Sequence, residues 1–127
     1  MGCDIHGWVE VYDNGKWIAV RELKDDSRNY KRFALLAGVR DYDNENKIKP
    51  KGIPSDVSDT TNYHIREFDV DGHSHSYIPL IEAVKIFSET AYKPAEVEKL
   101  YPMYGFFGID EDEVADKHAR LVFWFDN

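Results

Sequence analysis

The sequence predicts an α+β fold, in which a small mixed or antiparallel sheet packs with short helices. Residues 4–12 alternate apolar and polar side chains, and the Asp-Asn-Gly at residues 13–15 leads into a second β-like segment, residues 16–21. Residues 119–125 are apolar almost throughout, which is typical of a strand covered on both faces. We therefore expect an N-terminal hairpin beside the C-terminal strand, with that strand in the centre of the sheet.

The first strand presents two different faces, because successive side chains of a strand alternate. One face carries aliphatic residues and a cysteine, and the other is polar and aromatic. The first set is Cys3, Ile5, Val9 and Val11, and the second is Asp4, His6, Trp8 and Glu10. Asp4 and His6 are therefore expected to point away from the aliphatic row, and Cys3 is expected to be a small buried hydrophobe.

The segment between Asn29 and Gly38 predicts a short core helix. Apolar residues recur in it at helical spacing, Asn29 suits the N-cap, and Gly38 suits the position just after the last turn. Residues 41–54 are charged, contain proline and glycine, and lack an apolar period. We expect them to form a surface loop, and loops of this length often carry function.

Further helices are expected in the second half of the chain. Residues 55–68 can form a short helix that is capped by Ser55 or Ser58. Residues 79–89 carry an apolar stripe behind a proline that suits the first helical turn. Two briefer helices are expected at residues 94–100 and 110–118.

Length, charge and cysteine content limit the class of protein. At 127 residues the chain has the length of one domain, which we expect to span residues 1–127. The net charge of −8 disfavours nucleic acids and anionic membranes as partners, so a small molecule or a basic protein fits better. The single cysteine excludes an intramolecular disulfide and favours a cytoplasmic location. No stretch approaches the roughly 20 apolar residues of a membrane-spanning helix.

Two clusters of potential metal ligands stand far apart in the sequence. Asp4 and His6 share one face of the first strand, and His73 and His75 gain the same relation if their segment is also extended. Imidazole nitrogen and carboxylate oxygen are typical ligands of divalent metals. We therefore expect zinc or manganese to be held by these four residues. The alternative is that His6 forms a structural pair with Asp4 and that His75 is solvated on a loop.

Two short motifs also indicate a metal centre by resemblance. Residues 3–7, Cys-Asp-Ile-His-Gly, resemble the opening Asp-x-His-Gly motif of calcineurin-like metallophosphoesterases, and residues 72–75, Gly-His-Ser-His, resemble their late Gly-His-x-His motif. The resemblance implies a metal centre that includes His73. If such a centre hydrolyses a phosphoester, we expect the metal to activate water and a nearby carboxylate, Asp71 or Asp43, to accept the proton. The Gly-Asp and Gly-Asn-His motifs that complete the two-metal site of that family have no counterpart here, so its fold is not transferred.

From end to end, the chain resembles a group of small proteins encoded by bacteriophages. The resemblance implies a phage accessory protein that acts in the cytoplasm of the host cell, and it implies no particular activity. In that group the position of His75 can hold a small residue, so His75 is a weaker candidate for the site than His73, Ser74 and Ser76. The shared phrases occur at residues 1–6, 29–30, 33–40, 52–54, 71–74 with Ser76, and 123–127.

Basic and aromatic residues near the surface loop indicate a second kind of site. The basic side chains could hold a small anionic ligand, such as a nucleotide phosphate, while Trp8 or Tyr42 stacks on its base. Ser74 and Ser76 complete this set of candidate ligand contacts. Solvated loop lysines are the alternative. The basic residues concerned are Arg40, Lys47, Lys49 and Lys51.

Three hypotheses for the function follow from these patterns. The first is a phage accessory protein with a metal centre of Asp4, His6 and His73 that hydrolyses a phosphoester. The second is a non-catalytic module that sequesters a nucleotide signal or blocks a host defence protein, and the acidic charge fits the blocking version. The third is a component of the virion or of its assembly.

Overall fold

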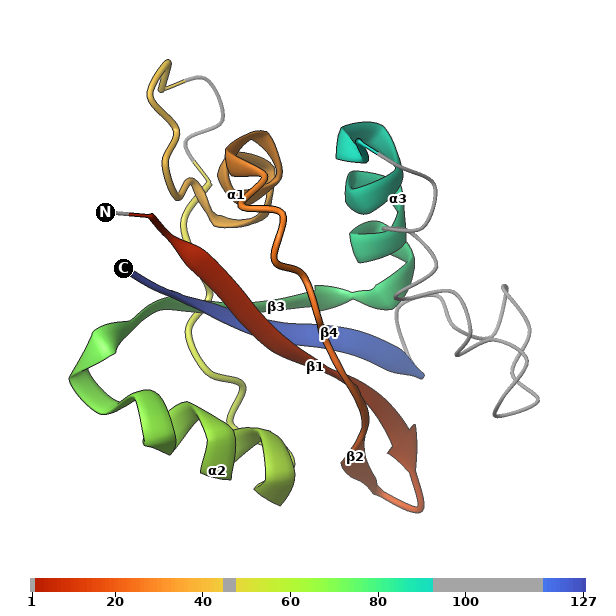
Figure 1. The fold of residues 1–127 in the computed structure, drawn as a ribbon. Helices are drawn as coiled ribbons and strands as arrows, with labels where there is room; N and C mark the ends of the chain where they lie inside the picture. The colour runs from red at the N-terminus through yellow and green to blue at the C-terminus, as the bar shows by residue number, and fades with distance from the viewer. Residues whose placement is uncertain (1, 45–47, 93–117) are drawn as a thin grey trace.

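The computed structural model describes residues 2–44, 48–92 and 118–127. In this part of the chain four antiparallel strands form one sheet in the order β2-β1-β4-β3, with helices on both of its faces (Figure 1). The predicted α+β class is confirmed. The elements in chain order are β1 (Asp4–Asp13), β2 (Lys16–Glu22), α1 (Tyr30–Ala37), α2 (Asp59–Phe68), the 3₁₀ helix η1 (Asp69–Asp71), β3 (Gly72–Pro79), α3 (Leu80–Thr90) and β4 (Ala119–Asp126).

The hairpin of β1 and β2 has the turn that its sequence predicts. Asn14 has a φ of 50° and Gly15 a φ of 80°, so both central residues of the turn are left-handed. Asparagine followed by glycine tolerates this conformation, which matches the twist of the flanking strands. The strands then pair from Asp13 and Lys16 onward, with an irregularity between Val9 and Glu10.

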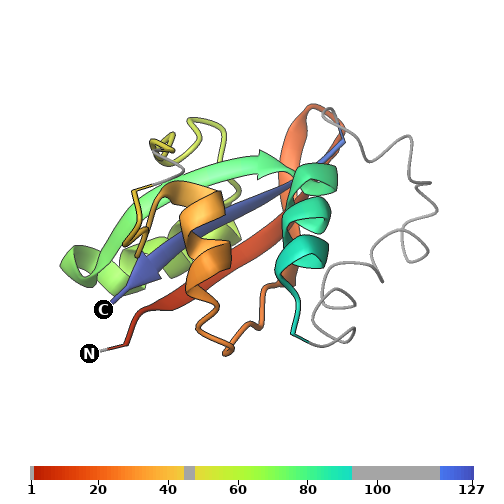
Figure 2. The same cartoon turned by 90° about the horizontal axis from the view of Figure 1, so that it is seen from above.

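Strand β4 lies in the centre of the sheet, between β1 and β3, as predicted. All of its residues from Ala119 to Phe125 are buried, because helices α1 and α3 cover one face of the sheet and α2 covers the other (Figure 2). On the first face Phe125 packs against Phe33 of α1, with ring centroids 5.1 Å apart. On the second face Trp124 packs against His64 of α2, also at 5.1 Å.

The predicted helix caps are largely confirmed. The side chain of Asn29 accepts a backbone N–H of the first turn of α1, and Gly38 follows the helix with a left-handed φ of 67°. Ser58, and not Ser55, caps α2 with its side chain. Pro79 occupies the N-cap position of α3, one residue before the first turn in which it was expected.

Charged side chains are buried on both faces, and each is paired there. Nη1 of Arg32 lies 2.8 Å from Oδ2 of Asp25, and both side chains are fully buried. On the α2 face, the fully buried Glu10 accepts hydrogen bonds from Arg120 and from the hydroxyl of Thr61, the latter at 2.7 Å. Removing one partner of such a pair typically costs about 3–5 kcal/mol, because a buried charge is left uncompensated. The Glu10 contacts thus tie α2 to the sheet.

The briefer helices expected at residues 94–100 and 110–118 fall almost wholly within residues 93–117, which lie outside the described residues. None of the helices that are described has the length and apolar character needed to cross a membrane.

Candidate functional site

The two histidine clusters lie at the same end of the sheet. Strands β1 and β3 begin on either side of the last residues of β4, where Asp126 pairs with Asp4 on one side and with Gly72 on the other (Figure 1). Neighbouring strands are about 4.8 Å apart, so the clusters are separated by roughly 10 Å of sheet. One strand therefore stands between the two groups of histidines.

A bulge at the start of β3 puts His73 and His75 on opposite faces of the sheet. Ser74 has a φ of 56°, and the pairing with β4 shifts register just after His73. His73 stacks on Phe125, on the α1 face, whereas His75 stacks on Trp124, on the α2 face. The expected same-face relation is not found, because the bulge inserts a residue and reverses the side-chain alternation.

Asp4 and His6 share the α2 face, but each has a partner of its own. Nε2 of His6 donates to Oδ1 of Asp126 over 2.7 Å, and its ring lies on that of Phe68 at 4.3 Å between centroids. Oδ1 of Asp4 accepts a 3.0 Å hydrogen bond from Nε of Arg28. The structural partner of His6 is therefore Asp126, and not Asp4 as in the alternative interpretation of the sequence.

The described ranges contain no group of three or more His, Cys, Asp or Glu side chains arranged to hold a metal ion. Asp71 is exposed at the end of η1. Cys3 is fully buried, as predicted, and burial raises the pKa of its thiol. The zinc or manganese centre therefore stays a prediction; its expected ligands are Asp4, His6, His73 and His75.

A groove on the α1 face gathers a different subset of the predicted residues. It has a volume of about 500 Å³ and lies where the end of α1 and the loop that follows meet the start of β3. Three residues predicted as ligand contacts or as part of the reacting centre line it together: Arg40, His73 and Ser74. The polar side chains at its lining are Arg40, Asn44, Lys49, His73, Ser74 and Asn127.

The groove is basic in an acidic protein. Among its described lining residues there are Arg40, Lys49 and His73 but no Asp or Glu, although the whole chain has a net charge of −8. A pocket of about 580 Å³ beside Asp4 and His6 is acidic instead, since its lining includes three acidic residues besides Asp4. Those residues are Glu22, Asp25 and Asp26.

The imidazole of His73 is held in the groove by hydrogen bonds at both nitrogens. Nδ1 lies 2.9 Å from the hydroxyl of Ser74, and Nε2 contacts Oδ1 of Asn127. In the neutral ring, both contacts are satisfied when Nε2–H donates to Asn127 and the Ser74 hydroxyl donates to Nδ1. The ring is thus fixed in orientation, and the bulge residue Ser74 supplies one of the two bonds.

The backbone around the groove is unusually constrained. Among the described residues six other than glycine have a positive φ, and three of these, Arg40, Asn44 and Ser74, line the groove. A left-handed conformation costs a residue with a side chain about 1–2 kcal/mol. Conformations of this cost concentrate at binding sites and active sites, where the surrounding structure maintains them.

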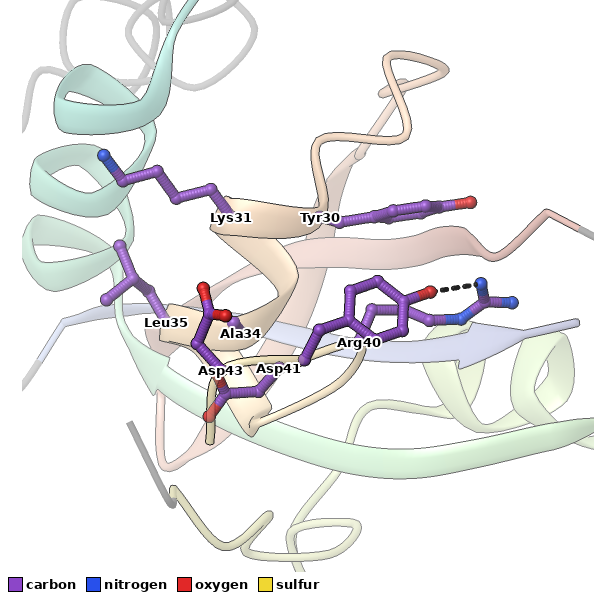
Figure 3. Close-up of a pocket in the computed structure, with 8 residues that line it drawn as sticks. Tyr30, Lys31, Ala34, Leu35, Arg40, Asp41 and Asp43 are labelled. Carbon is purple, nitrogen blue, oxygen red and sulfur yellow. Dashed lines mark hydrogen bonds between the residues drawn. The ribbon is translucent and has the colours of Figure 1, made fainter. Parts of the chain in front are cut away.

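A second pocket adjoins the groove and shares Arg40 with it (Figure 3). Its volume is about 380 Å³, and its lining includes Tyr30 and Tyr42. The guanidinium of Arg40 lies 5.1 Å from the ring centroid of Tyr30, and Nη1 donates to the hydroxyl of Tyr42 over 2.9 Å. Arg40 is therefore positioned by aromatic side chains on one side of the groove.

The remaining predicted contacts lie elsewhere. Trp8 is on the α2 face, where its Nε1 donates to Nδ1 of His64 over 2.9 Å. The buried hydroxyl of Ser76 accepts the backbone N–H of Lys51 over 3.1 Å, which holds the loop against β3. Lys47 lies outside the described residues. The sequence did not predict that Asn44 and Asn127 line one groove with His73, because their positions depend on how the loop and the end of β4 approach His73.

Comparison with known proteins yields no match to a family model, to a curated protein or to a solved structure.

Proposed function

We propose that this protein is a non-catalytic binding module that holds a small anionic, phosphate-bearing ligand in the groove between α1 and β3. The observation that carries the proposal is the charge of that groove. Its described lining joins two cationic side chains, Arg40 and Lys49, with the imidazole of His73 and has no acidic side chain, in a chain whose net charge is −8. Cationic donors that converge on one concave site are a usual means of binding phosphate.

The donors have complementary roles. The guanidinium of Arg40 supplies a fixed positive charge to the phosphate, and the ammonium of Lys49 adds a mobile one. His73 is oriented by Ser74 and Asn127, which suits recognition better than proton transfer, because both ring nitrogens already have partners. This arrangement favours sequestration of an anionic signal, within the phage setting that the resemblance implies, over hydrolysis.

Titration calorimetry with pyrophosphate tests the proposal. We expect binding by the unaltered protein and a loss of about tenfold or more in affinity for Arg40→Gln, since a hydrogen bond to a charged group is worth about 1.5–3 kcal/mol. Lys49→Gln, at an exposed position, should weaken binding less. Arg21→Gln is the matched control, because Arg21 is exposed on the edge strand β2 and lies outside the groove.

Equal affinity of the Arg40 and Arg21 variants would contradict the proposal. So would near-stoichiometric zinc or manganese in the purified protein, together with hydrolysis of a phosphodiester that His73→Ala abolishes. That second result would support the metal-centred hydrolase instead.

A further inference from the structure

We infer that the ligand is a nucleotide, whose base occupies the pocket next to the groove. This inference rests on the proposed function, because it assigns the phosphate to Arg40 and its neighbours. It extends the binding site to the tyrosine-lined pocket that shares Arg40 (Figure 3).

The adjoining pocket has the surface that a planar base requires. Tyr42 is 74% exposed, so most of its surface is open to a ligand. Tyr30 lies under the guanidinium of Arg40, and Ala34 and Leu35 of α1 supply an apolar part of the lining. Bases stack on exposed aromatic rings and on guanidinium planes, whatever their identity, because every base has a π face.

The distribution of charge sets the direction in which a nucleotide lies. The pocket lining carries the carboxylates of Asp41 and Asp43 beside the ammonium of Lys31, whereas no described side chain that lines the groove is a carboxylate. Carboxylates repel a phosphate but accept the N–H groups at the edge of a base. The phosphate therefore belongs in the groove and the base in the pocket, with Arg40 at the junction.

Binding of GMP, AMP and ribose 5-phosphate, compared by titration calorimetry, tests the inference. The unaltered protein should bind the two nucleotides about tenfold more tightly than the sugar phosphate, which is equivalent to about 1.4 kcal/mol. In Tyr42→Leu the two nucleotides and ribose 5-phosphate should bind with equal affinity, because the variant lacks the ring on which the base stacks.

Two further variants distinguish stacking on the Tyr42 ring from the hydrogen bond of its hydroxyl and from a general loss of an exposed tyrosine. Tyr42→Phe keeps the ring and loses the hydrogen bond to Arg40, so it should retain the preference for nucleotides. Tyr63→Leu is the matched control, because Tyr63 is 70% exposed on α2 and lines neither pocket, and it should bind like the unaltered protein.

Equal affinities for nucleotides and ribose 5-phosphate in the unaltered protein would overturn the inference and leave the anion site standing. A preference for nucleotides that survives Tyr42→Leu would overturn it as well. Failure of all three compounds and of pyrophosphate to bind would refute the proposed function itself.

Discussion

The backbone conformation of Ser74 determines which face of the sheet each neighbouring histidine occupies. Its left-handed conformation turns His73 toward the groove and its neighbour His75 toward Trp124 on the other side of the sheet. The two imidazoles therefore have different surroundings, one hydrogen-bonded at both nitrogens beside solvent and the other desolvated against an indole. The surroundings of His75 disfavour its charged form.

His75 should make the protein less stable in mild acid. Burial, and then the nearby charge of His73, lower the pKa of His75 below its usual value of 6.5. Its contribution to the free energy of unfolding is therefore fully present above pH 6.5 and is lost as the pH falls through the lowered value, because the unfolded chain takes up the proton first. Urea unfolding at pH 7.5 and at pH 5.5 should show this loss.

The variant His75→Gln should show a smaller loss of stability between the two pH values than the unaltered protein. His118→Gln is the control, because His118 is exposed, and it should keep the full dependence. An unchanged dependence in the His75 variant would assign the effect to other groups.

Single residues were predictable from the sequence where their conformation is set by near neighbours. Asn29 and Ser58 accept hydrogen bonds from residues three positions further on, so their role as caps is a local property. The bulge at Ser74 was not predictable, since it arises where β3 pairs with a strand from the far end of the chain. The same-face relation of His73 and His75, expected for a regular strand, is therefore absent, whereas Arg40, His73 and Ser74 do line one groove.

At the scale of elements, the junction between α1 and the following loop positions Arg40. Gly38 ends the helix with a φ of 67°, and the carbonyl oxygen of Ile48 approaches it so closely that a Cβ would lie 2.7 Å away. The loop can therefore return over the helix end and form one wall of the groove. A side chain at residue 38 would disturb both the backbone and this packing.

The variant Gly38→Ala should lower the free energy of unfolding by more than the roughly 1 kcal/mol that a left-handed alanine costs. Gly52→Ala isolates that conformational cost, because Gly52 has a φ of 89° and no atom lies within 4 Å of the place that a Cβ would take there. Urea unfolding of both variants should rank Gly38→Ala as clearly the less stable. Equal losses would show that the loop yields to the new methyl group.

Elements were predicted well where a short signal determines them. The Asn-Gly turn, the two caps of α1 and the apolar run of β4 each correspond to an element that the structure contains. The site was harder to predict, because the groove is formed by α1, a loop and the first residues of β3 together. No single segment carries the basic character that distinguishes it.

At the scale of the molecule, the two layers of helices are held to the sheet unequally. Helices α1 and α3 bury large apolar residues such as Phe33 and Phe87, whereas α2 buries only Thr61 and Ile65 along its length. Local unfolding of α2 should therefore need less free energy than disruption of the central strand.

Hydrogen exchange monitored by NMR should show this difference. Amides of β4 are expected to exchange slowest, near the limit set by global unfolding, and amides of α2 several orders of magnitude faster. The hydrogen-bonded amides of α1 provide the comparison, because their exchange rates should be closer to those of β4 than to those of α2. Exchange of α2 as slow as that of β4 would show that the Glu10 and Thr61 contacts suffice to join the two layers into one cooperative unit.

The central place of β4 also has a consequence for the synthesis of the molecule on the ribosome. Within the described sheet, strands β1 and β3 do not pair with each other and meet through a partner that is translated after both of them. Until residue 126 has left the exit tunnel, the nascent polypeptide lacks the strand that joins its two halves, and apolar surfaces of both stay uncovered. Completion of the sheet is therefore a late event that depends on contacts very distant in sequence, a feature that slows folding and leaves the emerging chain dependent on protection from aggregation.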